Sequence, residues 1–336
     1  MKPFFVDQPE WDDLIGRIYV ALERVTLSER GLSNRLELRR RGRIQSIHSS
    51  TAIEGNRLSE AEVRGVINGL TVFGYPQDIR EVQNAWSAYQ EFEAYDPFSV
   101  DSFLRAHGLM THGLITQSGI FRTGDVEVVN DEDPPRVLHV GADPEIVAEG
   151  VQQLLVWARD TTVHPLISSS ATHFMIEFIH PFQDGNGRMG RLWQTILLSR
   201  WNEMFAWMPT ETVARHHQLG YYQALQASHN GKIEASPFIT YMLKIIEESL
   251  QEYHTVITED QREGVNEGVN EGVSLDSVDT VIVDLLREDG SRTAVDLAHQ
   301  VQRSVQTVER RLSKLKSSGL LRRHGSDKTG VWIVKG

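Results

Sequence analysis

Apolar residues recur at three- and four-residue spacing through most of the first 260 positions, which is the spacing of one helix face. Ser59 with Glu62 forms a capping-box pair, and Asp143 before Pro144 is a typical helix start. The pattern therefore predicts a mainly α protein. The clearest predicted helices are Glu10–Val25, Glu60–Leu70, Ile79–Tyr95 and Pro144–Arg159.

One segment departs from this helical pattern. Residues Gly119–Val129 read GIFRTGDVEVV, in which Thr123-Gly124-Asp125 supplies a turn. Val126 and Val128 then alternate with their neighbours as in a short strand. We expect a β-hairpin over this segment, lying on a helical body.

A repeat marks a domain boundary near residue 261. Glu263–Val273 reads EGVNEGVNEGV, and a glycine at every fourth position disfavours a stable helix. Residues 261–275 are therefore expected to be a linker, or a helix extension that holds only when packed. The chain that follows predicts a winged helix-turn-helix over residues 276–336, with a Gly-rich turn between two strands. Its three predicted helices are Val278–Leu286, Thr293–Val301 and Ser304–Ser317.

The charge is distributed unevenly along the 336 residues. The net charge is −12, yet Arg303–Gly336 holds nine Lys or Arg and two Asp or Glu, a local +7 that leaves −19 for the rest. Such a balance argues against nucleic-acid binding by the whole surface and sets the C-terminal part apart. Cysteine is absent, which excludes disulfides and a cysteine nucleophile. No apolar run is long enough to span a membrane, and a cytoplasmic location is expected.

The segment Ile176–Arg191, IEFIHPFQDGNGRMGR, combines several groups that phosphate chemistry requires. A glycine-rich turn that opens a helix gathers backbone N–H groups where phosphates bind. Arg188 and Arg191 add positive charge, Asp184 can hold Mg²⁺, and His180 can take a proton near neutral pH. Each group alone is common in structural roles, but their combination in this order predicts a nucleotide site.

The string HPFQDGNGRMGR resembles the signature of the Fic family at every defined position. The resemblance implies a helical Fic core that moves AMP from ATP onto a protein hydroxyl. His180 would deprotonate the hydroxyl, Phe182 would anchor the loop, and Asp184 would bind Mg²⁺. The anion hole and the two phosphate clamps are the remaining implied residues: Gly185, Asn186, Gly187, Arg188 and Arg191.

Two features refine this resemblance. In relatives that resemble the Doc kinases a lysine stands at the position of Gly187, so glycine here favours AMP transfer over phosphate transfer. The expected hairpin falls where Fic proteins have a flap that aligns the target by strand addition. This chain has Ser118-Gly119 where many members have Pro-Gly. Upstream of it lies His107, which we expect to have a structural role. The flap residues expected to position the target are Gly119, Ile120, Phe121, Arg122 and Thr123.

A second motif lies N-terminal to the core. Ser50, Glu54 and Gly55 fit the inhibitory helix of one Fic class, here expected at about residues 45–56. The resemblance implies that Glu54 pairs with Arg191 and so removes the γ-phosphate clamp. The alternative is an ordinary helix end with a solvated Glu54.

The winged helix would place its third helix in the major groove of DNA. Arg322, Arg323 and Lys328 of the wing would meet phosphates, although such modules also bind proteins or dimerise. The local charge of +7 favours nucleic acid. The residues of the third helix expected to face DNA are Gln306, Thr307, Arg310, Arg311 and Lys314.

The predicted organisation is an N-terminal helical region (1–95), a Fic core (96–260), the linker and the winged helix. The predicted function is an autoinhibited protein adenylyltransferase that uses ATP and Mg²⁺ and modifies a Tyr, Ser or Thr hydroxyl of a target or of itself. The alternatives are a DNA-binding regulator whose Fic domain senses nucleotide, and a Fic de-adenylylase. A homodimer also fits the sequence, and no membrane partner is expected.

Overall fold

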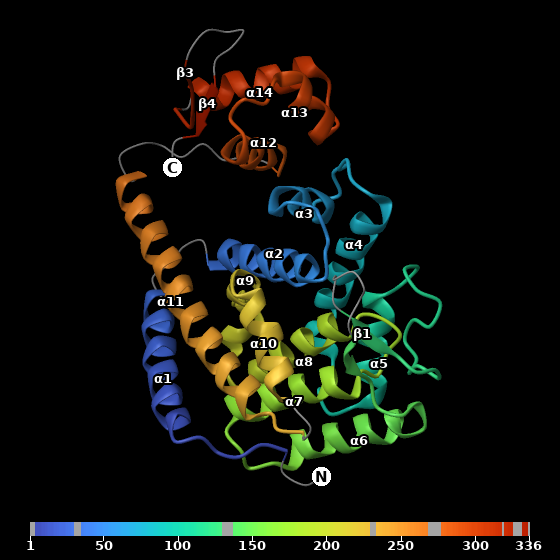
Figure 1. Cartoon of the computed structure of the whole chain (residues 1–336). Coiled ribbons are helices and arrows are strands. Elements are labelled where there is room, and N and C mark those ends of the chain that lie inside the picture. Colours follow the sequence, from blue (N-terminus) through green and yellow to red (C-terminus); the bar gives the residue numbers. More distant parts are fainter. Residues whose placement is uncertain are drawn as a thin grey trace. The chain divides into compact units, whose positions relative to one another are not determined.

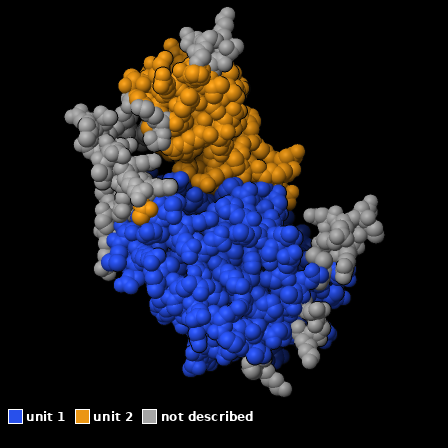
Figure 2. All heavy atoms as spheres, turned by 60° about the vertical axis from the view of Figure 1, so that its left-hand side comes forward, with its two compact units in different colours: residues 1–56, 84–257 blue, residues 57–83, 258–336 orange. Residues whose placement is uncertain are grey.

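A computed structural model of the chain describes residues 4–29, 35–129, 137–228, 233–267, 277–317, 319–324 and 331–334. Within these residues the chain forms two compact units (Figure 2). Unit 1 consists of residues 1–56 and 84–257, and unit 2 of residues 57–83 and 258–336. Helices dominate both units, with one two-stranded antiparallel sheet in each (Figure 1). The predicted mainly α fold is confirmed.

Unit 1 holds most of the helices. Those predicted to start at Glu10 and Pro144 are present, and Asp143 caps the second through the backbone N–H of Glu145. The elements of unit 1 are α1 (Glu10–Glu29), α2 (Arg35–Ile53), the C-terminal part of α4 (Pro76–Gln90), η1 (Phe92–Ala94), α5 (Val100–Met110), β1 (Glu127–Val129), β2 (Val137–Val140), α6 (Pro144–Asp160), α7 (Pro165–Ile179), α8 (Asn186–Trp201), η2 (Glu203–Ala206), α9 (Thr210–His216), α10 (Gln218–Ser228) and α11 (Ser236–Glu267) up to residue 257.

The helices α7 and α8 form the centre of unit 1 and are buried on most of their faces. The first ends at His180, whose φ of 52° is left-handed and is followed by Pro181, which cannot continue a helix. The second begins after Gly185, whose φ of 86° is also left-handed. A tight loop of six residues, 180–185, therefore joins two rigid, buried helices.

The predicted hairpin over Gly119–Val129 is wrong in its pairing. Strand β1 pairs with β2, which lies downstream, with Glu127 opposite Val140 and Val128 opposite His139. Residues 119–126 form no strand. The backbone N–H of Arg122 donates to Pro181 O at 3.0 Å, so this stretch is held against the loop after α7 instead of pairing with β1.

Helix α2 is longer than the inhibitory helix expected at about residues 45–56, because it runs from Arg35 to Ile53. Two residues after its end comes Gly55, whose φ of 92° is left-handed. The N–H groups of Gly55 and Asn56 donate to Ala52 O and Thr51 O, which closes the last turn. Glu54 therefore stands at a fixed place on the end of a helix.

Unit 2 contains the three predicted C-terminal helices, α12 (Ser277–Glu288), α13 (Ala294–Val301) and α14 (Val305–Ser317). They are followed by an antiparallel pair, β3 (Leu321–His324) and β4 (Val331–Val334), in which Leu321 lies opposite Val334. Their apolar faces form one core that includes Leu297, Val308 and Leu312. Helix, turn and strand order match the winged helix expected from the sequence.

Helix α3 (Glu60–Ile67) also belongs to unit 2, as does the first part of α4. Its predicted capping box is present, and Ala61 is buried in the core of the three C-terminal helices. Arg64 Nε lies 3.2 Å from Asp284 Oδ2 of α12. The compact units thus divide the chain differently from the expected boundary near residue 95, because the apolar face of α3 is covered by a helix more than 200 residues later.

The expected linker begins inside a helix, since α11 continues to Glu267. The remainder of the repeat lies outside the described residues. Among the described residues, none of the helices combines the length and the apolar character that crossing a membrane would require.

Candidate active site

The loop between α7 and α8 begins with His180, whose ring is held by a contact to the preceding turn. Its Nδ1 lies 3.3 Å from Glu177 O one turn earlier in α7. A carbonyl can only accept, so this contact requires Nδ1–H. In the neutral ring Nε2 then holds the lone pair, which is the form that a general base needs.

The shape of the loop is fixed by Asn186 and Phe182. The amide of Asn186 makes two hydrogen bonds to the backbone of Phe182, with Oδ1 accepting from N at 2.9 Å and Nδ2 donating to O at 3.0 Å. Both residues are buried. The side chain of Asn186 therefore stabilises the conformation of the loop. Only its backbone N–H is available to the anion hole that the sequence predicted.

The first turn of α8 faces the loop with unsatisfied backbone donors, as the start of any helix does. Gly185 leads into this turn, and Gly187 lies within it. The buried side chain of Arg188 adds positive charge nearby and donates to Asp184 Oδ2 at 3.0 Å. A glycine-lined, cationic cradle for an anion therefore lies directly after His180 in the chain.

Asp184 is the candidate metal ligand of this loop. Its Oδ1 accepts from the N–H of Gly185 at 2.6 Å, and about half of its side chain (56%) is exposed. Among the described residues no group of three His or acidic side chains gathers as a metal site. A single, partly exposed carboxylate is a donor that an ion such as Mg²⁺ can use, since this ion takes one or two protein carboxylates and completes its shell with phosphate and water.

Arg191, one turn further along α8, is bound by the end of α2. Its Nη2 donates to Glu54 Oε1 at 2.5 Å and to Ser50 O at 3.0 Å, and its Nε donates to Ser50 Oγ at 2.9 Å. Burial alone would lower the pKa of Arg191, but the combined effect of Glu54, Tyr221 and Glu177 outweighs burial and raises the pKa. The structure thus brings together the three residues, Ser50, Glu54 and Arg191, that the sequence predicted as an inhibitory contact.

Gly187 is tightly enclosed by this ion pair. A Cβ atom at this position would collide with Glu54 Oε1 and would lie 3.1 Å from Arg191 Nη1. Even alanine would therefore push against the Glu54–Arg191 pair. With the Glu54 carboxylate in this position, only glycine fits at residue 187 without displacing it.

The predicted flap residues divide into two groups. Ile120 is half-exposed, Thr123 is exposed, and Phe121 stacks on Phe182 with ring centroids 5.8 Å apart. Gly119 has a left-handed φ of 74° and donates its N–H to His107 Nδ1 at 3.0 Å. Ile120 and Thr123 thus present their side chains to solvent, whereas Phe121 packs on Phe182.

Arg122, one of the residues expected in the flap, has a buried side chain. Its side chain is 3% exposed and donates to backbone carbonyls of His180 at 2.7 Å, Gly124 at 2.7 Å, Ile179 at 3.3 Å and Ala142. Burial lowers its pKa. Arg122 therefore fastens the flap to the loop that contains His180.

Two further groups lie around the site, and sequence reasoning singled out only His107, which it expected to be structural. His107 contacts both Gly119 and Asp184, and burial lowers its pKa to about 4. In α7, burial acts to raise the pKa of Glu177, but hydrogen bonding and attraction to His173 lower it to about 2, and Tyr221 also donates to Glu177 at 3.1 Å. Glu177 lies in the largely buried helix α7, where its position resembles that of any other helix residue, so no local signal identified it.

In unit 2 the predicted DNA-facing residues do not all point outward. Asp279 of α12 is fully buried and accepts from Arg311 Nη1 at 2.6 Å and Lys314 Nζ at 3.5 Å. Arg311 is mostly buried by this contact, so its assignment to the outer face is corrected. Gln306 and Arg310 are exposed, and Thr307 is half-buried.

The wing shows a similar division. Arg322 is exposed, whereas the guanidinium of Arg323 lies over the Trp332 ring, 4.7 Å from its centroid. Lys328 lies outside the described residues.

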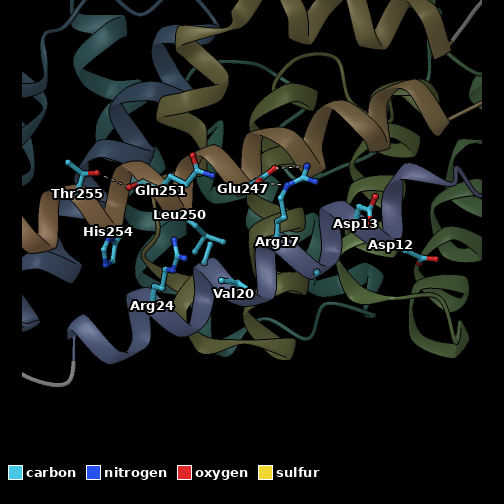
Figure 3. Close-up of a pocket in the computed structure, with 12 residues that line it drawn as sticks. Asp12, Asp13, Arg17, Val20, Arg24, Glu247, Leu250, Gln251, His254 and Thr255 are labelled. Carbon is cyan, nitrogen blue, oxygen red and sulfur yellow. Dashed lines mark hydrogen bonds and ion pairs between the residues drawn. The ribbon is translucent and has the colours of Figure 1, made fainter.

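A pocket of unit 1 lies away from the predicted residues, between α1 and α11 (Figure 3). Arg17 donates to Glu247 at 2.7 Å across it, and Val20 and Leu250 contribute apolar surface. Its lining has charges of both signs and includes no residue of the segment 180–191. We therefore place the candidate active site at the loop and not in this pocket.

Comparison with known proteins agrees with this placement. Residues 97–198 match the Fic/DOC family, and residues 275–316 match the AsnC-type helix-turn-helix domain. The structure is similar over all of this chain, and over 99% of the other, to a Fic family protein from Desulfovibrio desulfuricans G20, with 30% identity and a TM-score of 0.71.

Two protein adenylyltransferases are similar in sequence over part of their length. These are fic-1 of Caenorhabditis elegans and Fic of Culex quinquefasciatus, each 28% identical over 62% of this chain. The match spans only 40% and 41% of these relatives. A structure of Fic-1 from C. elegans has a TM-score of 0.59 at 22% identity, which concerns the fold alone.

Proposed function

Since this chain belongs to the Fic family, we propose that it is a protein adenylyltransferase whose active site is the loop between α7 and α8. The observation that carries the proposal is the placement of His180, with Nε2 as its proton acceptor, beside the glycine-lined start of α8. Relatives named protein adenylyltransferase match this region in sequence.

The proposed reaction joins a protein hydroxyl to the α-phosphate of ATP. His180 Nε2 takes the hydroxyl proton while the oxygen forms a bond to the α-phosphorus. The bond from that phosphorus to the oxygen shared with the β-phosphate breaks, and pyrophosphate leaves with the electron pair. Backbone N–H groups at the start of α8 and the charge of Arg188 stabilise the phosphate oxygens, which is the main contribution that such a transfer requires.

Asp184 would hold the Mg²⁺ ion that accompanies ATP. When bound, this ion would supply positive charge that offsets the charge of the phosphates. The chain itself sets the position of the carboxylate, because the N–H of Gly185 and the guanidinium of Arg188 hold its two oxygens. These two hydrogen bonds therefore restrict the orientation of the Asp184 carboxylate.

We further propose that α2 inhibits the enzyme. Arg191 would bind the γ-phosphate, but Glu54 and Ser50 occupy its guanidinium. The Glu54 carboxylate also places a negative charge where a phosphate would have to enter. Substitution of Glu54 should release Arg191 and allow ATP to bind productively.

The experiment is transfer of label from α-labelled ATP with Mg²⁺, for wild type, Glu54→Gly, Glu54→Gln and His180→Ala. We expect strong labelling of protein by Glu54→Gly, intermediate labelling by Glu54→Gln, which keeps an acceptor but loses the charge, and none by His180→Ala. γ-Labelled ATP should give no label, because the γ-phosphate leaves with the pyrophosphate. Absence of α-label in every variant that still binds ATP would reject the proposal and favour a nucleotide sensor.

A de-adenylylase would behave differently in the same assay. Protein labelled by Glu54→Gly would lose its label on addition of wild type and would keep it on addition of Glu54→Gln. Such a result would assign Glu54 a role in the reverse reaction in addition to inhibition.

We also infer that unit 2 binds DNA. The helix-turn-helix match and the exposed side chains of Gln306 and Arg310 on α14 support this second activity. Titration of the full chain with duplex DNA at 50 and 200 mM salt tests it. Binding that weakens steeply with salt is expected for phosphate contacts, and no binding at the lower salt concentration would reject it.

A further inference from the structure

His107 of α5 joins two parts of the proposed active site that lie far apart in the sequence. It is completely buried, and both ring nitrogens make hydrogen bonds to backbone. Nδ1 is 3.0 Å from the N–H of Gly119, at the start of the flap. Nε2 is 3.0 Å from the carbonyl oxygen of Asp184, in the phosphate-binding loop.

These two partners determine the tautomer of the ring. A backbone N–H can only donate, and a carbonyl can only accept. Nδ1 must therefore hold the lone pair and Nε2 the proton. In this tautomer the ring accepts a hydrogen bond from Gly119 and donates one to Asp184. The other neutral tautomer could make neither bond.

The position of the ring is also fixed by stacking. The imidazole lies face to face with Phe182, with centroids 3.6 Å apart and planes 4° from parallel. Phe182 is itself held by the two hydrogen bonds from Asn186. His107 is therefore part of the same rigid assembly as the loop that follows His180.

The flap side of the contact is equally restricted. Gly119 packs on α5 so closely that a Cβ atom there would lie 3.2 Å from Gly108 Cα and 3.4 Å from Leu104 O. Ser118 Oγ donates to Gly108 O at 3.0 Å and lies 2.8 Å from Thr111 Oγ1. A shift of the imidazole would therefore move the start of the flap.

We propose that His107 is a positioning residue that sets the flap, where the target hydroxyl is presented, in register with the loop that holds His180 and the ATP phosphates. This proposal rests on the proposed adenylyltransferase function. His107 contacts neither substrate, and it acts through the N–H of Gly119 on one side and the carbonyl of Asp184 on the other. Loss of either contact should have a different kinetic consequence.

Two substitutions separate the contacts. Asparagine can place an amide oxygen where Nδ1 lies, so His107→Asn keeps the acceptor for Gly119 and loses the donor to Asp184. Glutamine can place an amide nitrogen where Nε2 lies, so His107→Gln keeps the donor to Asp184 and loses the acceptor for Gly119. His107→Ala removes both.

The kinetic test measures transfer of AMP from ATP onto the chain itself, in the Glu54→Gly background. His107→Asn should raise the KM for ATP roughly tenfold, because the phosphate-binding turn loses its support. His107→Gln should lower the maximal rate roughly tenfold with the KM for ATP unchanged, because the flap and not the nucleotide site is displaced. Equal effects of the two variants on both parameters would overturn the proposal.

A measurement independent of activity accompanies the kinetics. Hydrogen exchange of the Gly119 amide should stay slow in wild type and His107→Asn and become at least tenfold faster in His107→Gln and His107→Ala. Unchanged exchange in all variants would show that the ring only fills space. This result stands even if no AMP transfer is found, so failure of the proposed function is distinguishable from failure of the role of His107.

A second variant covers the case in which His107 variants do not fold. Gly119→Ala leaves the ring intact but adds a Cβ against Gly108 at a left-handed φ. It should reproduce the kinetics expected of His107→Gln. Gly124→Ala, where an added Cβ meets nothing within 4 Å, is the matched control and should leave the kinetics unchanged. A Gly119→Ala enzyme with wild-type parameters would contradict the proposal.

Discussion

The carboxylate of Glu54 accepts a hydrogen bond from Nη2 of Arg191 at 2.5 Å, although the two residues are 137 positions apart in the chain. Arg191 is almost completely buried, whereas about a third of the Glu54 side chain is exposed. The ion pair is therefore open to solvent on the Glu54 side. An incoming phosphate would have to compete with Glu54 for Nη2 of Arg191.

Ser50 should contribute to the same contact by a smaller amount. Ser50→Ala removes the hydroxyl that accepts from Arg191 Nε but keeps the carbonyl and Glu54. Loss of one hydrogen bond to a charged group corresponds to about 1.5 kcal/mol, so AMP transfer should rise roughly tenfold, less than in Glu54→Gly. Ser49→Ala is the matched control, because Ser49 is also buried but hydrogen-bonds to Thr212. A larger rise in Ser49→Ala than in Ser50→Ala would contradict this assignment.

Gly187 should depend on Glu54 in a double-mutant cycle. Gly187→Ala should lower the free energy of unfolding of wild type by about 1–3 kcal/mol, because its Cβ collides with the Glu54 carboxylate. In the Glu54→Gly background the cost should fall by at least half, since the collision is removed. Chemical denaturation of the four proteins measures the coupling. Equal costs in both backgrounds would show that Glu54 does not approach Gly187 in solution.

Glu177 should make the stability of unit 1 sensitive to acid. Burial raises its pKa, but its contact with His173 lowers the pKa to about 2, below the ordinary value of 4.5. The unfolded chain therefore binds a proton before the folded chain does, and the stabilisation present above pH 4.5 is lost as the pH falls toward 2. Between pH 5 and 2 wild type should lose about 3 kcal/mol more than Glu177→Gln. The free energy of unfolding is measured in guanidinium at each pH. An equal loss in wild type and Glu177→Gln would contradict the lowered pKa of Glu177.

The assignment of α3 to unit 2 predicts a long-range effect on stability. Ala61→Asp should expose α12 and α13 to hydrogen exchange, because it buries a charge among the apolar residues of the C-terminal helices. The expected loss is several kcal/mol. Val295→Asp adds the same charge at a position that is 50% exposed and should have little effect. Unchanged exchange of α12 in Ala61→Asp would argue against the shared core.

Arg310 and Arg311 are adjacent and should behave differently. Arg310→Ala should weaken DNA binding and reduce the salt dependence by about one ion, because Arg310 is exposed on α14. Arg311→Ala should instead lower the stability of unit 2 by about 2 kcal/mol, since it removes the closer partner of the buried Asp279. Salt-dependent DNA titration and thermal unfolding of both variants measure the difference. The reverse pattern would assign Arg311 to the DNA interface.

The chain's local features were readable without tertiary information. The capping box of Ser59 and Glu62, the helix start at Asp143 and the loop from His180 to Gly185 depend on residues a few positions apart. Short-range sterics and hydrogen bonds determine such features, so their order in the sequence is sufficient. The same holds for the motif that predicted the Fic fold, because its chemistry is held within twelve consecutive residues.

Contacts between distant segments were decided only by the tertiary structure. The strand partner of β1 is β2 and not residues 119–126, since Arg122 is used to bind four carbonyls. Arg311 turns to Asp279, and α3 packs on α12. Which distant residues a side chain contacts depends on how the helices pack against one another. The spacing of residues along a single helix does not contain this information. The sequence by itself therefore determined the reactive loop, whereas the packing of the whole chain decided which residues hold that loop in place.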